Sequence, residues 1–210
     1  LDTSESAKAL AESIGATFHN WNIDNVVKEN TQIIEQAIGR PTSWEEDDIP
    51  LQNIQARSRS PLIWMLANIK KQILLTTSNR SEGDVGYATM DGDTSGSLAP
   101  IAGVDKEFIL QWLKYAEKDL GYSGLKAVNR LSPTAELRPS EMAQSDEDDL
   151  MPYSILRAIE IQAIRNHQSP KQSFENLKMG FSIDENILKS YIKKFFRLWS
   201  INQWKRERLA

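Results

Sequence analysis

Hydroxyl, carboxylate and glycine residues cluster directly after the apolar run at residues 72–77, and these residue types can bind a nucleotide. Thr77, at the end of that run, can donate a hydrogen bond to a phosphate or to the edge of a base. Glu82, five residues further on, can hold Mg²⁺ or a ribose hydroxyl, because Mg²⁺ prefers hard oxygen ligands together with substrate phosphates. The alternative is a polar surface loop in which Gly, Asp and Ser serve turn geometry, and the pattern alone favours this alternative.

Two positions further toward the N-terminus carry groups suited to anions. Asn53 and Arg57 lie four residues apart, so an α-helix places them on one face. A guanidinium fork beside an amide suits a carboxylate or a phosphate. The alternative is a solvated helix face, where such residues usually lie.

The remaining candidate positions are Lys106, Thr134 and the C-terminal segment. Lys106 begins an expected helix, where a lysine can reach a phosphate as a mobile point charge, although most lysines are simply exposed. Thr134 precedes a carboxylate and can also contact phosphate. Residues 189–208 interleave basic and aromatic side chains, which suits nucleotide or nucleic-acid binding. We favour the alternative, an amphipathic helix that packs Phe195, Phe196 and Trp199 into a core.

The composition excludes several functional classes. The 210 residues carry 29 acidic and 25 basic side chains, so the formal charge of −4 argues against a general nucleic-acid binder. The absence of cysteine excludes a disulfide scaffold, a cysteine-ligated zinc site and a cysteine nucleophile. No apolar run approaches the roughly 18 residues of a membrane-spanning helix, and residues 1–10 lack the basic and apolar regions of a signal peptide.

Hydrophobic spacing predicts an alternation of strands and helices. Strands are expected at residues 16–23 and 72–77, and helices at 4–14, 24–38, 51–71, 105–118, 152–167, 171–179 and 184–200. Asp24 is expected to cap the second helix, and Ser60-Pro61 marks a break or restart in the third. The acidic residues 146–149 are assigned to helix capping and solubility.

This order of elements is typical of βαβ units, and it predicts an α/β fold with a parallel sheet flanked by helices. Two strands cannot bury their faces alone, so the fold is expected to be incomplete at the N-terminus, with further strands before Leu1. In an open parallel sheet, ligands bind beyond the carboxyl ends of the strands. The loop after residues 72–77 is therefore the first candidate site.

Six segments, taken in order, resemble those of the NAD synthetases. They are residues 53–59, 74–82, 86–93, 99–106, 133–137 and 144–148, which read NIQARSR, LLTTSNRSE, GYATMDGD, APIAGVDK, PTAEL and QSDED. The resemblance covers nearly the whole chain. The Gly-Tyr-Ala-Thr stretch and the long helical C-terminal region are more similar to the glutamine-dependent members than to the ammonia-dependent ones.

The resemblance implies a Rossmann-like adenine-nucleotide α-hydrolase fold over residues 1–210, with residues 152–210 as its helical C-terminal part. It implies that ATP and Mg²⁺ adenylate the carboxylate of deamido-NAD with release of pyrophosphate. Ammonia, from glutamine or free ammonium, then gives NAD and AMP. The implied partners are an upstream glutaminase domain and further copies of the chain, in a cytoplasmic homodimer or larger homo-oligomer without nucleic acid or membrane.

The resemblance also implies roles for individual residues. Thr77, Lys106 and Thr134 would contact ATP, and Glu82 would ligate Mg²⁺ or contact deamido-NAD. No protein nucleophile is required, because the carboxylate of deamido-NAD attacks and the protein mainly positions it. Asn53 and Arg57 would contact deamido-NAD, either within the same chain or across the dimer interface. The other contacts to deamido-NAD would be Tyr87, Ala88, Thr89, Met90 and Lys205.

One motif of the resembling family does not occur in these 210 residues. The Ser-Gly-Gly-x-Asp-Ser loop, which in that family cradles the pyrophosphate of ATP, has no counterpart. We therefore expect the chain to be a fragment that lacks this loop and the amidase domain, and to be inactive alone. The alternative is a noncatalytic nucleotide-binding or oligomerisation module with the same fold.

Overall fold

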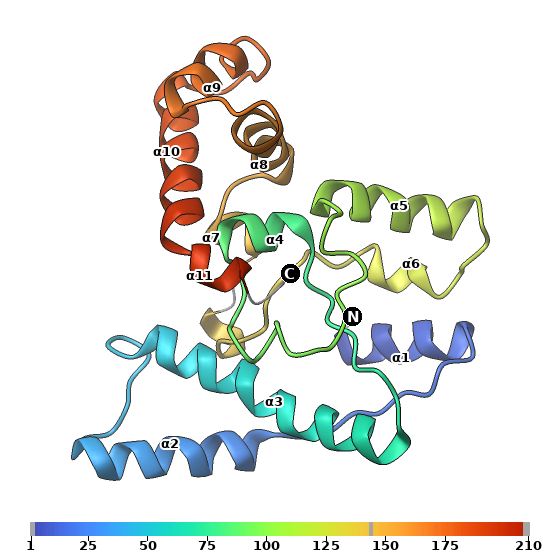
Figure 1. Ribbon diagram of the computed structural model, residues 1–210. Helices are drawn as coiled ribbons and strands as arrows, with labels where there is room; N and C mark the ends of the chain where they lie inside the picture. The colour runs from blue at the N-terminus through green and yellow to red at the C-terminus, as the bar shows by residue number, and fades with distance from the viewer. Residues whose placement is uncertain (1–2, 143–144, 208–210) are drawn as a thin grey trace. The chain divides into compact units, whose positions relative to one another are not determined.

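The computed structural model describes residues 3–142 and 145–207, which are mainly helical (Figure 1). Within these residues, no helix combines the length and the apolar character needed to cross a membrane. The elements are α1 (Thr3–Ser13), α2 (Asp24–Ile38), α3 (Asp48–Lys70), α4 (Arg80–Val85), α5 (Lys106–Lys118), α6 (Leu125–Val128), η1 (Ser140–Met142), α7 (Asp146–Asp149), α8 (Tyr153–Glu160), η2 (Ile161–Arg165), α9 (Pro170–Leu177), α10 (Glu185–Ile201) and α11 (Gln203–Arg206).

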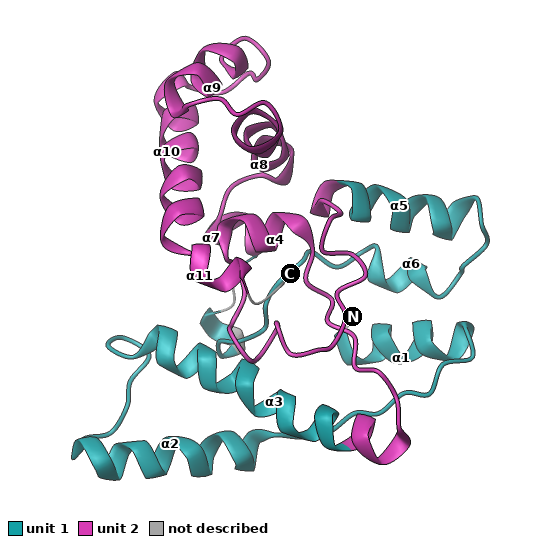
Figure 2. Cartoon of the chain, in the orientation of Figure 1, with its two compact units in different colours: residues 1–65, 108–145 teal, residues 66–107, 146–210 magenta. Residues whose placement is uncertain are grey.

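The chain divides into two compact units, which Figure 2 distinguishes by colour. Unit 1 consists of residues 1–65 and 108–145, and unit 2 consists of residues 66–107 and 146–210. Each unit therefore combines two stretches that are separate in the sequence. The chain passes from one unit to the other within α3, again within α5, and a third time at the start of α7.

In unit 1, local sequence explains the bounds of α2. The Asn22 side chain accepts a hydrogen bond from the Asp24 backbone N–H, so Asp24 is the first helical residue and its prediction as the cap is wrong. Gly39 ends the helix in the left-handed conformation with φ +71°, where other residues would be strained. The predicted helix over residues 24–38 is confirmed.

Helix α3 continues through Pro61, so the break or restart expected there is wrong. A proline inside a helix removes one backbone hydrogen bond and usually bends or ends the helix. Ala56, Ser58 and Ser60 are buried along this part of α3. We attribute the continuity of the helix to this packing, which local sequence rules do not include.

The core of unit 2 forms between α8 and α10. Leu156 and Ile159 from α8, and Ile192 and Phe195 from α10, are at most 2 % exposed. The Asp184 side chain caps α10 by accepting hydrogen bonds from two backbone N–H groups of its first turn. The prediction that Phe195 packs into a core is confirmed.

The two predicted strands fare differently. Residues 16–23 form no strand, so that prediction is wrong: a strand needs a partner for its backbone, and the structure offers none. Residues 72–77 are extended, and an isolated parallel bridge joins Leu75 to Leu98. This bridge is the only pairing of the predicted parallel sheet within residues 3–142 and 145–207.

Candidate functional site

In unit 2, backbone pairing fixes the extended segment that precedes the polar loop. The Thr76 N–H donates to the Leu98 carbonyl at 2.9 Å, and the Ser97 N–H donates to the Leu74 carbonyl at 2.7 Å. At Gly96 a Cβ would come within 2.7 Å of the Thr76 nitrogen. Glycine therefore allows the two backbones to approach this closely.

Side chains then order the polar loop. The Thr76 hydroxyl donates to the Asp93 carbonyl at 2.7 Å, and the Asp93 carboxylate accepts a hydrogen bond from the Thr89 N–H at 2.7 Å. Thr76 is buried, whereas Thr77, the predicted ATP contact, is exposed. Thr76 thus stabilises the loop, and Thr77 stays accessible to a ligand.

The short helix α4 begins with a reciprocal cap. The Asn79 side chain accepts a hydrogen bond from the Glu82 N–H at 3.1 Å, and Glu82 Oε2 accepts one from the Asn79 N–H at 3.4 Å. The spacing Asn-x-x-Glu is a sequence signal for this arrangement. The cap fixes the direction in which the Glu82 carboxylate points.

The second oxygen of Glu82 meets Lys106. The distance from Glu82 Oε1 to Lys106 Nζ is 2.9 Å, and the same ammonium lies 3.9 Å from Asp146 Oδ2. All three side chains are at most 20 % exposed. The Tyr153 hydroxyl donates to Asp146 Oδ2 at 2.8 Å, and burial, followed by the charge of Asp146, raises the pKa of Tyr153 well above its usual value.

The position of Asp146 corrects the interpretation of the acidic run 146–149. Asp146 is 5 % exposed and contacts Lys106 and Tyr153, so it does not serve solubility. A run of acids is normally a solvated helix start, and only tertiary packing reveals that one member is buried. Gln144, in the same resembling segment, lies outside the described residues.

The predicted dinucleotide contacts after α4 lie together with Lys205. The Lys205 ammonium donates to the carbonyls of Gly86 and Ala88, both at 2.8 Å. The Tyr87 hydroxyl donates to an Asp149 carboxylate oxygen at 2.9 Å. Unit 2 therefore brings Lys205 to the segment with which the resemblance associates it.

Thr89 and Met90 lie deeper than their neighbours. They are 7 % and 8 % exposed, whereas Tyr87 and Ala88 are half-buried. The side chains of Thr89 and Met90 therefore support the segment, and those of Tyr87 and Ala88 offer more of the surface that a ligand can reach.

Sequence reasoning missed a second charged cluster in unit 2. One Arg80 nitrogen lies 3.1 Å from Asp105 and 3.4 Å from Glu160, and Asp84 lies on the same short helix as Arg80. Burial raises the pKa of Asp84 to about 6, against the opposing charge of Arg80. Burial, followed by the charge of Asp84, raises the pKa of Glu160 to about 7. The i, i+4 spacing of Arg80 and Asp84 was the one available signal.

In unit 1, Asn53 and Arg57 line a pocket between α2 and α3 of about 460 Å³. The prediction that they share a helix face is confirmed. Ile33 and Ile34 of α2 and Leu51 of α3 also line the pocket, which is mostly apolar. It combines one guanidinium and one amide with a large apolar wall.

Thr134 belongs to unit 1, whereas Thr77 and Lys106 belong to unit 2. It is exposed, and its hydroxyl accepts a hydrogen bond from the Glu136 N–H at 3.4 Å. The side chain of Thr134 therefore lies on the surface of unit 1.

The residues around Lys106 fit a Mg²⁺ ion that arrives with a nucleotide. Within the described residues, no group of three or more acids or histidines could hold a metal ion. Mg²⁺ at nucleotide sites usually needs only one or two carboxylates, because waters and substrate phosphates supply the other ligands. Glu82 and Asp146 supply two carboxylates within 4 Å of the Lys106 ammonium.

Unit 2 thus combines an exposed hydroxyl, a partly buried ammonium and two carboxylates after an extended segment. In α/β proteins this is where nucleotides bind. The sequence matches the NAD synthase family over residues 2–207, and the chain belongs to this family.

Solved structures and curated relatives agree with this assignment. The crystal structure of a glutamine-dependent NAD(+) synthetase from Cytophaga hutchinsonii is 54 % identical, with a TM-score of 0.83 over 98 % of this chain and 32 % of that chain. A glutamine-dependent NAD+ synthetase from Acinetobacter baumannii, solved in complex with ADP, is 26 % identical, with a TM-score of 0.53 over 98 % of this chain and 34 % of that chain. The Arabidopsis thaliana glutamine-dependent NAD(+) synthetase is 32 % identical over 97 % of this chain and 31 % of its own length.

The chain has the fold of solved NAD synthetases, and the predicted family is confirmed. It spans about a third of the length of the curated relatives that it matches.

Proposed function

We propose that the full-length protein forms NAD from deamido-NAD by ATP-dependent amidation through an adenylated intermediate. Glutamine or free ammonium supplies the nitrogen. The observation that carries this proposal is the contact between Glu82 and Lys106 in a chain of the NAD synthase family. It places a cation and a Mg²⁺-compatible carboxylate next to the loop that carries Thr77.

The charges of this cluster suit the adenylation step. When the carboxylate of deamido-NAD attacks the α-phosphate of ATP, negative charge develops on the phosphate oxygens and on the leaving pyrophosphate. Lys106 and the hydroxyls of Thr77 and Thr134 would stabilise that charge. Glu82 would hold Mg²⁺, and the ion would neutralise phosphate charge when bound.

The dinucleotide would be positioned by two groups of residues. In unit 2, Tyr87, Ala88, Thr89 and Met90 would line its site together with Lys205, whose ammonium already lies against this segment. Asn53 and Arg57, which line a pocket of unit 1, would contact deamido-NAD across a dimer interface. A guanidinium and an amide match the carboxylate and phosphates of that substrate.

The remaining parts of the proposal concern fold and partners. The parallel bridge at Leu75 and the 71 % exposure of Ile73 support a parallel sheet completed by strands of the longer protein. The exposed Ile33, Ile34 and Ile38 on α2 support assembly with a further copy of the chain. A glutaminase domain and a cytoplasmic location belong to the same proposal, which rests here on the family.

The test is NAD formation by the full-length protein with ATP, Mg²⁺, deamido-NAD, and either glutamine or ammonium. Lys106→Met keeps the aliphatic stem and removes the charge, so we expect kcat for NAD to fall by about a hundredfold. The matched control is Lys114→Met, an exposed lysine of the same helix, which should behave as wild type. Failure of the wild-type protein to form NAD with either nitrogen donor would refute the proposal.

A further inference from the structure

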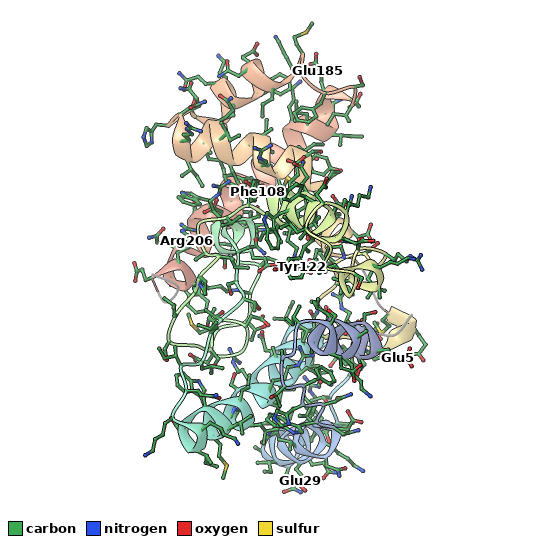
Figure 3. All side chains as sticks on the ribbon, turned by 90° about the vertical axis from the view of Figure 1, so that its right-hand side faces the viewer. Glu5, Glu29, Phe108, Tyr122, Glu185 and Arg206 are labelled. Carbon is green, nitrogen blue, oxygen red and sulfur yellow. The ribbon has the colours of Figure 1, made fainter. Side chains whose placement is uncertain are left out.

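Three side chains of the segment 202–206 bind one short stretch of backbone in unit 2. The Arg206 guanidinium donates to the carbonyl of residue 84 at 3.0 Å, and the Asn202 amide donates to that of residue 85 at 2.7 Å. The Lys205 ammonium donates to the carbonyls of residues 86 and 88. We refer to Asn202, Lys205 and Arg206 as the C-terminal clamp. Figure 1 shows α11 beside α4, and Figure 3 labels Arg206 there.

Helix α4 needs such partners because it is short. Its six residues are too few to form a stable helix alone. The cap formed by Asn79 and Glu82 satisfies its first turn, but the carbonyls of the last turn of a helix also lack intrahelical partners. Asp84, Val85 and Gly86 are buried, so these carbonyls require protein donors. The C-terminal clamp supplies them.

The clamp is itself held firmly. The Arg206 guanidinium lies 3.7 Å from the centre of the Trp199 ring and donates to the Trp199 carbonyl at 2.6 Å. Gly86 adopts the left-handed conformation, and a Cβ there would lie 2.4 Å from the Asn202 Cβ. Close packing on one side and a stacked guanidinium on the other leave the end of α4 little freedom to move.

We propose that Asn202 and Arg206 are positioning residues for substrate binding, because they hold the end of α4 from which the binding groups extend. Glu82 lies on α4, and residues 87–90 follow Gly86, which ends that helix. A loosened α4 would misplace both groups, and misplacement of about 1 Å is costly in a binding site. This inference rests on the proposed function, since the ligand of residues 87–90 is taken to be deamido-NAD.

Hydrogen exchange in the full-length protein tests the clamp without any activity. In Arg206→Ala and Asn202→Asp, the amides of residues 82–90 should exchange about tenfold faster than in wild type. The first variant loses the hydrogen bond from a charged guanidinium, and the second loses the amide donor to the carbonyl of residue 85. Arg206→Lys keeps one donor, so its exchange rate should lie between those of wild type and Arg206→Ala. The matched control is Arg197→Ala, which removes an exposed guanidinium of α10 and should change nothing. Unchanged exchange in all clamp variants would overturn the proposal.

Kinetics then separate positioning from a merely structural role. We expect the clamp variants to raise KM for deamido-NAD about tenfold per active enzyme. A structural role would lower the amount of active protein and leave that KM unchanged, so an unchanged KM overturns the inference. Absence of NAD formation by the wild-type protein would instead refute the proposed function, and the exchange data would still show whether the clamp holds α4.

Discussion

The two candidate regions of this chain are built in opposite ways. In unit 2, Glu82 and Lys106 form a close ion pair, and each is about a fifth exposed. In unit 1, Arg57 is exposed and lines a pocket with mostly apolar walls, where Ile33 and Ile34 are 63 % and 55 % exposed. The region in unit 2 is a set of charges held by ion pairs and hydrogen bonds. The region in unit 1 is a mostly apolar pocket with a guanidinium and an amide in its lining.

This difference predicts different contributions to the reaction. Charges fixed in a partly buried site act most strongly where charge develops in the transition state, so they should affect kcat. An exposed guanidinium contacts substrate and transition state about equally, so it should affect KM. Substitutions in each region should therefore leave distinct kinetic signatures.

The largest effect is expected from Glu82→Gln in the full-length protein. Glutamine can keep the reciprocal cap with Asn79, so the substitution removes the charge and largely preserves α4. We expect the rate of deamido-NAD-dependent pyrophosphate release to fall by about 10²–10³-fold.

The control for this substitution is Glu45→Gln, which changes an exposed acid of unit 1. Pyrophosphate release should be followed over a range of Mg²⁺ concentrations. A wild-type rate for Glu82→Gln at saturating Mg²⁺ would remove Glu82 from its proposed role and weaken the contrast between the units.

A smaller effect is expected from Arg57→Ala. Because this contact should be similar in the ground state and the transition state, KM for deamido-NAD should rise about tenfold while kcat stays nearly constant. Arg130→Ala removes another exposed guanidinium of unit 1 and serves as the control. An effect of Arg57→Ala on KM for ATP alone would contradict the proposed contact.

Local patterns in the sequence were sufficient to predict most helices. The bounds of α2 follow from apolar spacing and from Gly39, both of which act within a few residues. The strand expected at residues 16–23 failed because a strand depends on a partner that local sequence does not specify. The break expected at Pro61 was wrong for a related reason, since packing of the surrounding helix outweighs the local tendency of proline to end a helix.

In the candidate site, too, the sequence revealed some features and not others. Spacing made Glu82, Lys106, Asn53 and Arg57 candidates, and the resemblance to a family, rather than the local pattern alone, gave them their predicted roles. The burial of Asp146 and Glu160 was not predictable, since it depends on helices that are distant in the sequence. Nothing local distinguishes a buried acid from an exposed one.

Acidic side chains provide a further comparison, because Asp47 in unit 1 and two buried acids in unit 2 respond to pH in opposite ways. In unit 1, hydrogen bonds from Arg40 and from the Ser43 backbone lower the pKa of Asp47 to about 2, so this contribution to stability is lost as the pH falls toward that value. In unit 2, burial raises the pKa of Asp84 to about 6 and, with the charge of Asp84, that of Glu160 to about 7. The folded state therefore binds these two protons more tightly, and their contribution to stability is lost as the pH rises from about 4, where these acids ionise in the unfolded chain, to about 6 to 7.

The smallest predicted effect is the stabilisation of the full-length protein by Asp84→Asn, because the amide need not ionise in its buried site. We expect the free energy of unfolding to rise by about 1–2 kcal/mol near pH 8 and by less near pH 5, as measured with denaturant. The pKa of about 6 is the net result of burial, which raises it, and of the charges of Arg80 and Arg206, which lower it. Asp119→Asn, in an exposed position, should change neither value. A loss of stability near pH 8 would mean that pairing with these arginines outweighs burial, and that α4 is held by the same kind of ion pair as Arg40 and Asp47 in unit 1.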